Sequence, residues 1–322
     1  MKTESIHLVA CAKTRFVKIM CCLFALIACV VFAVPVVSAA QQQKMFATPE
    51  AAVKALISAV KTNNEKALLV LLGPGADSII SSGDPVADQF GRESFVKAYD
   101  EKHWLADGAG AVKILHVGNK DYPMPIPIAR KGKMWFFDTE AGKEEILCRR
   151  IGRNELNAID VLREYAHAQR EYAAKDRNAD GVLEYAQKLS STPGRKDGLY
   201  WEAAPGQEES PFGPLVAKAA TKGYTPKAGE ETPNPYRGYF FRILTMQGPH
   251  AGGGAYEYIA NGRMILGFAM VAYPAHYGTS GVMTFIVNQE GIVYQKDLGS
   301  DTEKVATEMT AYDPDTSWKK AE

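Results

Sequence analysis

The 322-residue sequence predicts an α+β fold in two domains, residues 40–152 and 153–322, behind an N-terminal export signal at residues 1–39. Two observations predict the fold class. In each half, segments with apolar residues at helical spacing precede short strand-like runs that turn residues separate, and this order is typical of α+β units. The boundary is expected near Gly152, because a strand-type run ends there and a long amphipathic segment follows.

The first 39 residues have the order of a secretory signal. Basic residues precede an apolar run from Ile19 to Val37, and the small residues Ser38-Ala39-Ala40 that follow suit a signal peptidase. We expect cleavage there, giving a periplasmic or secreted protein without a membrane span. Two alternatives remain open: an uncleaved signal that anchors the chain in the membrane, and lipid attachment at Cys29, which follows Leu26-Ile27-Ala28.

After cleavage the chain is close to neutral and holds one cysteine, Cys148. One cysteine allows no intrachain disulfide, so ordinary apolar cores must hold the protein together. The small negative net charge of about −3 gives no support to nucleic-acid binding or to an anionic membrane surface. We expect Cys148 to be a packed thiol, with a nucleophilic thiol as the alternative.

The first half begins with helical patterns. Thr48-Pro49-Glu50 has the order of a helix start: a hydroxyl cap, Pro at the first helical position and an acid in the first turn. Further helices are expected at residues 65–72 and 90–99, followed by strands at 112–117, 126–129 and 133–138. This order is similar to that of nuclear-transport-factor-two-like folds. Neither His103 nor His116 has an acid or metal ligand spaced to pair with it, so no chemistry is assigned to them.

The second half is expected to pack one helix on a four-stranded antiparallel sheet. Asn154 can cap a long helix, whose face with Leu156, Ile159, Leu162 and Tyr165 would cover the sheet. The expected strands are residues 239–246, 264–273, 282–288 and 293–296.

Two resemblances accompany these patterns. The helix from Asn154 with the segments Gly238-Tyr239-Phe240-Phe241 and Gly291-Ile292-Val293 resembles the headpiece of type IV pilins and pseudopilins. Over a hundred residues separate this helix from the apolar N-terminal segment, so pilus assembly is not expected.

Nearly the whole mature chain resembles an exported bacterial family of unknown function, family 2950. The segments that carry this resemblance are Phe46-Ala47-Thr48-Pro49-Glu50, Ser82-Gly83-Asp84, Arg150-Ile151-Gly152-Arg153-Asn154-Glu155-Leu156, Asp197-Gly198-Leu199-Tyr200-Trp201 and Tyr277-Gly278-Thr279-Ser280-Gly281. The resemblance implies an envelope location and a shared fold, and it supplies no activity.

The strongest chemical signal is a possible calcium loop, with Asp176, Asn178 and Asp180 at positions one, three and five, a glycine at six and Glu184 at nine. Position twelve is Gln187, where a calcium hand has a bidentate acid. A plain polar turn would select the same residues, so the loop predicts either weak calcium binding or a turn.

No catalytic set is evident in the sequence, so a binding or assembly role is expected, with an envelope protein or a glycan as partner. Aromatic residues that could stack on a sugar are Trp201, Tyr236, Tyr239, Tyr256, Tyr258, Tyr273 and Tyr277, although a buried core is the simpler explanation. The glycine-rich run from Gly248 to Gly254 is interpreted as a hairpin end.

The alternative function is a periplasmic hydrolase, in which His276, Ser280 or similar residues meet only in the fold. Such an enzyme requires a His within hydrogen-bond reach of a Ser, Cys or acid inside one pocket.

Overall fold

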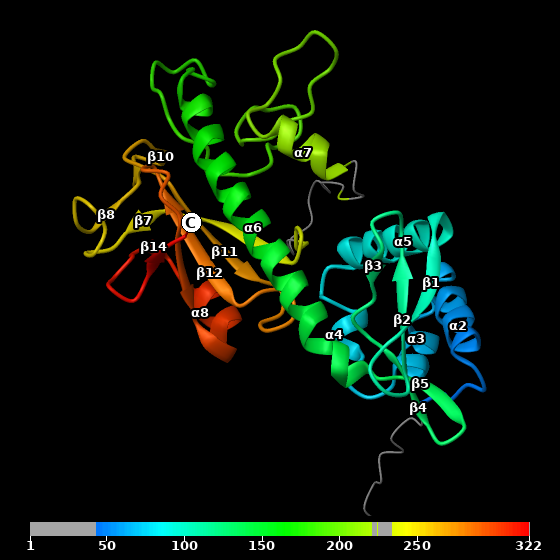
Figure 1. Cartoon of the computed structure of the whole chain (residues 1–322). Helices are drawn as coiled ribbons and strands as arrows, with labels where there is room; N and C mark the ends of the chain where they lie inside the picture. Colours follow the sequence, from blue (N-terminus) through cyan, green and yellow to red (C-terminus); the bar gives the residue numbers. More distant parts are fainter. Residues whose placement is uncertain (1–42, 221–223, 225–233, 322) are drawn as a thin grey trace, which may run out of the picture. The chain divides into compact units, whose positions relative to one another are not determined.

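The computed structural model describes residues 43–220, 224 and 234–321 and has the α+β fold that the sequence predicts (Figure 1). The export signal and Cys29 lie outside the described residues. Within the part of the chain that the structure describes, no helix is long and apolar enough to cross a membrane.

The N-terminal half places helices before an antiparallel sheet. Thr48 caps the first helix as expected, since its hydroxyl accepts a hydrogen bond from the Ala51 backbone N. The sheet has the order β1-β2-β4-β5. Strand β3 pairs with His116 and Val117 of β2, on the edge of β2 opposite to β1. The elements are α2 (Pro49–Lys61), α3 (Glu65–Leu72), α4 (Asp77–Ile80), α5 (Pro85–Glu101), β1 (His103–Asp107), β2 (Val112–Val117), β3 (Tyr122–Pro123), β4 (Ile128–Lys131) and β5 (Met134–Phe137).

One face of this sheet packs against the helices, and we call it the inner face. Leu115 and Val117 of β2 lie on it, together with Ile128 of β4 and Phe137 of β5, and all four side chains are buried. With apolar residues of α2 and α3 they form the first of two separate hydrophobic cores.

The long helix α6 (Thr139–Ala173) corrects the expected helix start at Asn154. Asp138 is the residue that caps it, by accepting a hydrogen bond from the Ala141 backbone N. Gly152 does not interrupt the helix, and its position faces open space. The Asn154 side chain donates instead to the backbone O of Ser280, at 2.8 Å.

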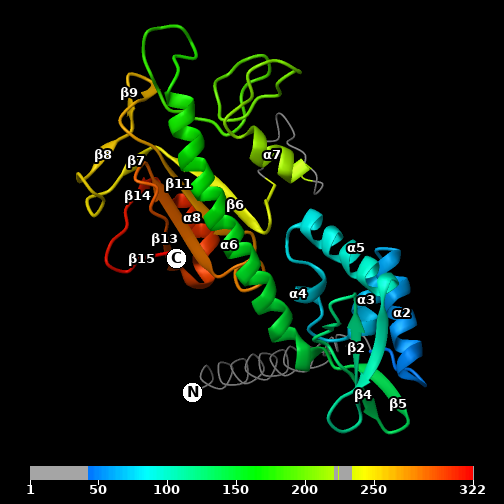
Figure 2. The same ribbon diagram turned by 45° about the horizontal axis from the view of Figure 1, so that its top comes forward.

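The C-terminal half is built on an antiparallel sheet with the order β15-β13-β12-β11-β6, and α6 crosses it, packing on β11 and β12 (Figures 1 and 2). This is the expected helix on a sheet, with β15 as an additional strand. The elements are α7 (Gly213–Ala220), β6 (Tyr239–Leu244), β7 (Met246–Gln247), β8 (Tyr256–Glu257), β9 (Ile259–Ala260), β10 (Arg263–Met264), β11 (Ala269–Pro274), β12 (Met283–Asn288), β13 (Tyr294–Asp297), the 3-10 turn η1 (Gly299–Asp301), α8 (Thr302–Glu308), β14 (Ala311–Tyr312) and β15 (Lys319–Lys320).

The helix face that covers the sheet is close to the expected one. Leu162 and Tyr165 are fully buried and belong to the second hydrophobic core, and the Tyr165 hydroxyl donates to the backbone O of Ala269. Leu156 was expected on the same face, but 63% of its surface is exposed. Cys148, expected to be packed, is also exposed. Both errors come from the first half of α6, where few apolar residues mark a face and the helix leaves the core surface.

Helix α6 changes partner along its length. Before Gly152 it contacts the N-terminal half, where the Arg150 guanidinium donates to the backbone O of Ser78 at 2.5 Å. After Gly152 it contacts the C-terminal half, where Glu155 accepts hydrogen bonds from the backbone N of Val282 and of Met283, each at 3.0 Å. Whether the two halves fold separately stays a prediction.

Candidate binding site

The outer face of the N-terminal sheet, opposite the helices, carries apolar side chains that belong to neither core. The strand register places Trp104 opposite His116, and Ala129 opposite both Val112 and Phe136. Because side chains alternate along a strand, these residues share one face. All of its apolar side chains are exposed or partly exposed: Trp104, Ala106, Val112, Ile114, Ala129, Met134 and Phe136.

Trp104 is the most prominent of these side chains, with 44% of its surface exposed. It is the only exposed tryptophan of the four in the chain. Its indole stacks on the His116 ring, with 4.4 Å between the ring centroids. The indole Nε1 donates to Asp121 Oδ1 at 3.1 Å. A stacking contact on one face and a hydrogen bond at the Nε1 edge therefore hold this exposed ring in one orientation.

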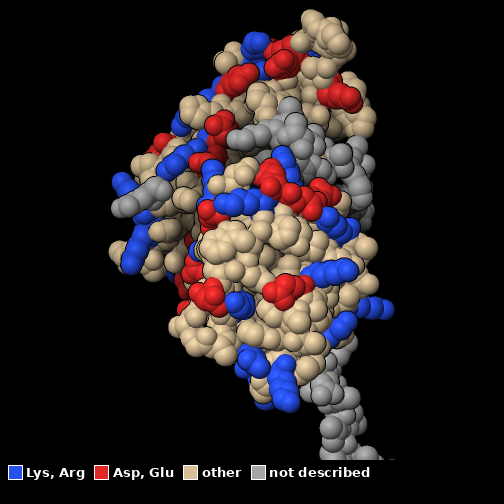
Figure 3. Space-filling model, turned by 45° about the vertical axis from the view of Figure 1, so that its right-hand side comes forward, with Lys and Arg blue, Asp and Glu red and all other residues tan. Residues whose placement is uncertain are grey.

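The charged side chains next to Trp104 are Lys102 and Asp121, and they pair with each other: Lys102 Nζ donates to Asp121 Oδ1 at 2.7 Å. A second ion pair, between Lys113 Nζ and Asp107 Oδ1 at 2.5 Å, lies on the other face of the hairpin. The hydrogen bonds from Lys102 and Trp104 lower the pKa of the Asp121 carboxyl below its usual value. The surroundings of the indole are thus polar but carry balanced charge. Figure 3, whose view brings the right-hand side of Figure 1 forward, shows that Lys and Arg side chains lie among Asp and Glu side chains on that side of the molecule.

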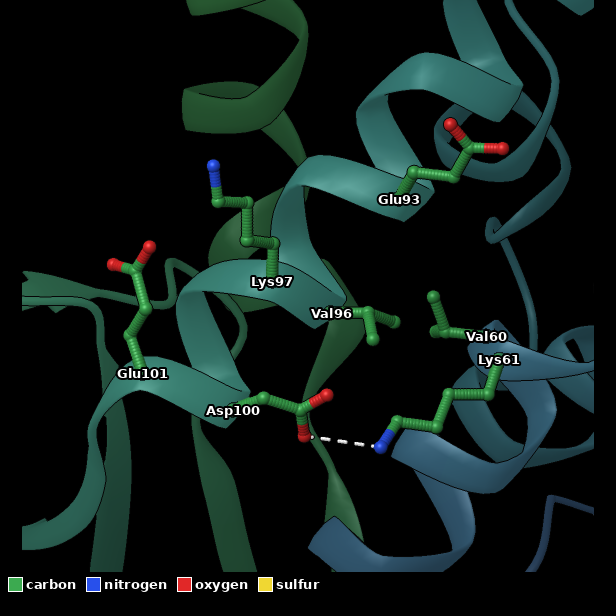
Figure 4. A pocket seen from close by; sticks show the side chains of 7 residues that line it. All are labelled: Val60, Lys61, Glu93, Val96, Lys97, Asp100 and Glu101. Carbon is green, nitrogen blue, oxygen red and sulfur yellow. Dashed lines mark hydrogen bonds and ion pairs between the residues drawn. The ribbon is translucent and has the colours of Figure 1, made fainter.

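A separate hollow of about 600 Å³ lies between the C-terminal parts of α2 and α5 (Figure 4). Lys61 Nζ and Asp100 Oδ1 form an ion pair across it at 3.0 Å. Its lining consists of Val60, Lys61, Glu93, Val96, Lys97, Asp100 and Glu101. This lining contains no His, Ser or Cys, so the hollow does not meet the requirement stated for a hydrolase.

Histidine contacts elsewhere do not meet that requirement either. His250 Nδ1 lies 2.9 Å from Asp313 Oδ2, and the hydrogen bond raises the pKa of His250, but neither residue lines the hollow. The Ser280 hydroxyl bonds the backbone N and O of His276, and not its ring. The geometry of the described residues thus gives no support to the alternative of a hydrolase.

The four residues predicted to bind calcium lie together in an exposed turn after α6. Asp176 accepts hydrogen bonds from the backbone N of Gly181 and of Asp180, and the first of these chiefly lowers the pKa of Asp176. Asn178 donates to Glu184 at 3.0 Å. Asp180 Oδ2 pairs with Arg263 at 2.6 Å.

Ordinary turn contacts therefore account for all four loop residues. Within the described residues, no group of three or more His, Cys, Asp or Glu side chains lies close enough to hold a metal ion. Calcium binding through Asp176, Asn178, Asp180 and Glu184 stays a prediction.

Most of the aromatic residues singled out in the second half lie in the core. Tyr239 and Tyr258 are fully buried, Tyr273 and Trp201 nearly so, and only Tyr277 is clearly exposed, at 40%. An exposed ring that could stack on a sugar lies instead in the first half, at Trp104. No chemistry was assigned to His116 from the sequence, because no acidic residue is spaced to pair with it. In the structure its partner is the Trp104 ring on the adjacent strand. The signal was the hairpin itself, which sets Trp104 opposite His116.

Segments that carry the family resemblance meet around the buried Asp84, because a Cβ on Gly238, whose backbone N donates to Asp84, would lie against Asn154 and Ser280. Asp84 Oδ2 accepts hydrogen bonds from the Gly238 backbone N at 2.9 Å and from the Tyr224 hydroxyl at 2.7 Å. Burial and the adjacent Asp84 raise the pKa of Tyr224 well above its usual value, so its phenol stays protonated and donates. Nearby, the His276 ring packs on Gly83, where a Cβ would lie 2.0 Å from it. This junction joins the two halves and has every hydrogen-bonding group of Asp84 satisfied, which indicates a structural role.

The molecule is therefore an α+β protein with two hydrophobic cores joined by a long helix and a buried polar junction. The chain belongs to the DUF2950 family of proteins of unknown function, whose profile matches residues 43–321. No curated protein and no solved structure matches the chain. No solved structure therefore supports the resemblance to pilin headpieces, which stays a prediction.

Proposed function

We propose that this is an exported protein of the bacterial envelope that acts by binding, and that the outer face of the N-terminal sheet is its contact surface. The observation that carries this proposal is the set of apolar side chains on that face, led by Trp104 and Ile114, that packs in neither core. A contiguous exposed apolar surface is costly in a soluble protein and usually marks an interaction site. Export is supported by the basic, apolar and small-residue order of residues 1–39.

The binding role is tested with the mature protein, residues 40–322, tagged at its C-terminus and incubated with envelope extract. Wild-type protein should retain specific protein or polysaccharide components. Ile114→Asp places a charge in the centre of the outer face and should abolish their retention. The matched control is Leu266→Asp, because Leu266 is 52% exposed in the C-terminal half. Equal retention by both variants would refute the assignment of the outer face.

Export is tested by the intact mass of the protein recovered from the periplasm or medium. We expect a chain that begins at Ala40 or Gln41. A chain that begins at Met1, or one that carries a lipid on Cys29, would contradict cleavage at this site and point to one of the anchored alternatives.

A further inference from the structure

We propose that Trp104 is the stacking platform of a glycan-binding site that takes a pyranose ring of a neutral polysaccharide. This inference rests on the proposed binding function of the outer face and names the ligand class. A pyranose presents apolar C–H groups on its ring faces and hydroxyl groups around its edge. A matching site needs a flat exposed aromatic ring with hydrogen-bonding groups at its border.

The Trp104 ring is held ready for such a ligand. His116 supports one face of the indole, and Asp121 holds the Nε1 edge, so the exposed area is on the side away from His116. Lys102 in turn holds Asp121. A free exposed side chain loses rotamer entropy on binding, whereas a side chain that is already fixed does not lose it again.

Polar groups at the border of the indole can reach the ring hydroxyls. Asp121 Oδ1 accepts both hydrogen bonds, from Lys102 and from Trp104, which leaves Oδ2 as an acceptor. His116 Nδ1 lies 3.2 Å from the backbone O of Asp121, which can only accept, so Nδ1 carries a proton. In that tautomer Nε2 is an acceptor. These acceptors suit the hydroxyl donors of a sugar.

The charge pattern favours a neutral glycan over a charged polymer or a protein. Lys102, the lysine beside the platform, is paired with Asp121, so this cation is not left for an ionic ligand. A stable protein interface buries roughly 800 Å² on each partner and has few charges at its centre. Trp104 instead lies on an edge strand, beside the ion pair of Lys102 with Asp121.

The test uses the fluorescence of the mature protein, residues 40–322. Trp104 is the one exposed tryptophan, so a sugar on its ring should shift the emission and protect it from acrylamide quenching. The probes are a β-1,4-linked N-acetylglucosamine tetramer, a β-1,4-glucose tetramer and purified peptidoglycan sacculi. We expect saturable binding of at least one probe, with a Kd that changes less than twofold between 50 and 500 mM salt.

Three variants make the test specific. Trp104→Ala should weaken binding by tenfold or more, as measured by calorimetry or sedimentation with sacculi, while Trp104→Phe should retain part of the affinity. Tyr277→Ala, which removes an exposed ring from the C-terminal half, should bind as the wild type does. Thermal melting confirms that each variant is folded.

The outcomes separate this inference from the proposed function. If no probe binds, or if Trp104→Ala binds as well as the wild type, the glycan site is refuted. Retention of an envelope protein that Ile114→Asp abolishes would then still support the outer face as a binding surface. If no probe binds and Ile114→Asp retains the same envelope components as the wild type, both proposals are refuted.

Discussion

At the scale of single residues, the buried Asp84 side chain caps a helix and also joins the two halves, through three hydrogen bonds in all. Its Oδ1 caps α5 by accepting a hydrogen bond from the Ala87 backbone N, and its Oδ2 accepts from Gly238 and Tyr224 of the other half. The sequence indicated only a family segment here and placed the start of the helix at residue 90. The cap was recognisable as Asp84-Pro85, but the partners 140 and 154 residues away were not.

Replacing Asp84 with alanine should therefore destabilise the protein strongly. Three hydrogen bonds are lost, and the Gly238 N–H and the Tyr224 hydroxyl are left partly buried without this acceptor, which together should cost about 3 kcal/mol. The measurement is the free energy of unfolding from denaturant titration. Asp138→Ala is the control, since Asp138 caps α6 with one hydrogen bond and should cost about 1 kcal/mol. Equal losses in the two variants would contradict the role of the junction.

At the scale of elements, several strands were predicted closely, whereas strand β1, the start of β11 and the start of the long helix were not. β6, β12 and β13 lie within two residues of the runs expected for them, because alternating apolar residues between turns mark a strand on both sides. The start of α6 was missed because Gly152 and the expected cap Asn154 suggested a boundary. A glycine inside a helix costs only about 1 kcal/mol, and packing on both sides outweighs that cost.

The burial of α6 predicts a sharp contrast between two leucines in the same helix. Leu162 is fully buried against the sheet, so Leu162→Ala should destabilise the protein by about 2–5 kcal/mol. Leu156 is 63% exposed, so Leu156→Ala should change the stability by less than about 0.5 kcal/mol. Chemical denaturation of the two variants measures the difference. A large loss of stability in Leu156→Ala would show that Leu156 packs against the sheet, as the sequence predicted.

The loop after α6 gives a second prediction at this scale. Partial burial and the nearby carboxylate of Asp180 raise the pKa of Glu184, and a bound cation would relieve this repulsion. Calcium must compete with the Arg263 guanidinium for Asp180, so binding should need millimolar calcium. We expect millimolar calcium to raise the melting temperature, Asp180→Ala to abolish the rise and Arg263→Gln to enlarge it. Identical melting curves with calcium and with chelator would leave the loop as a turn.

At the scale of the whole molecule, the arrangement of two cores along one helix could be predicted only in part. Each half has its own hydrophobic pattern, and those patterns gave the α+β class. The contacts that join the halves, such as Asp84 with Gly238, link residues 154 apart, and no local pattern specifies such a pair. The outer face of the N-terminal sheet was missed for the same reason, since it exists only once the strands are in register.

The change of partner along α6 leads to the last prediction, which concerns the fragments 40–152 and 153–322. The first fragment keeps the core between Phe46 and Phe137 together with the part of α6 that Arg150 fixes to Ser78. The second keeps the part of α6 that packs on its sheet. Each fragment should therefore fold alone and unfold cooperatively, at a lower temperature than the full chain because both lose the contact between Asp84 and Gly238. Circular dichroism melts decide this, and two unfolded fragments beside a cooperative full chain would show that α6 must be continuous for either core to form.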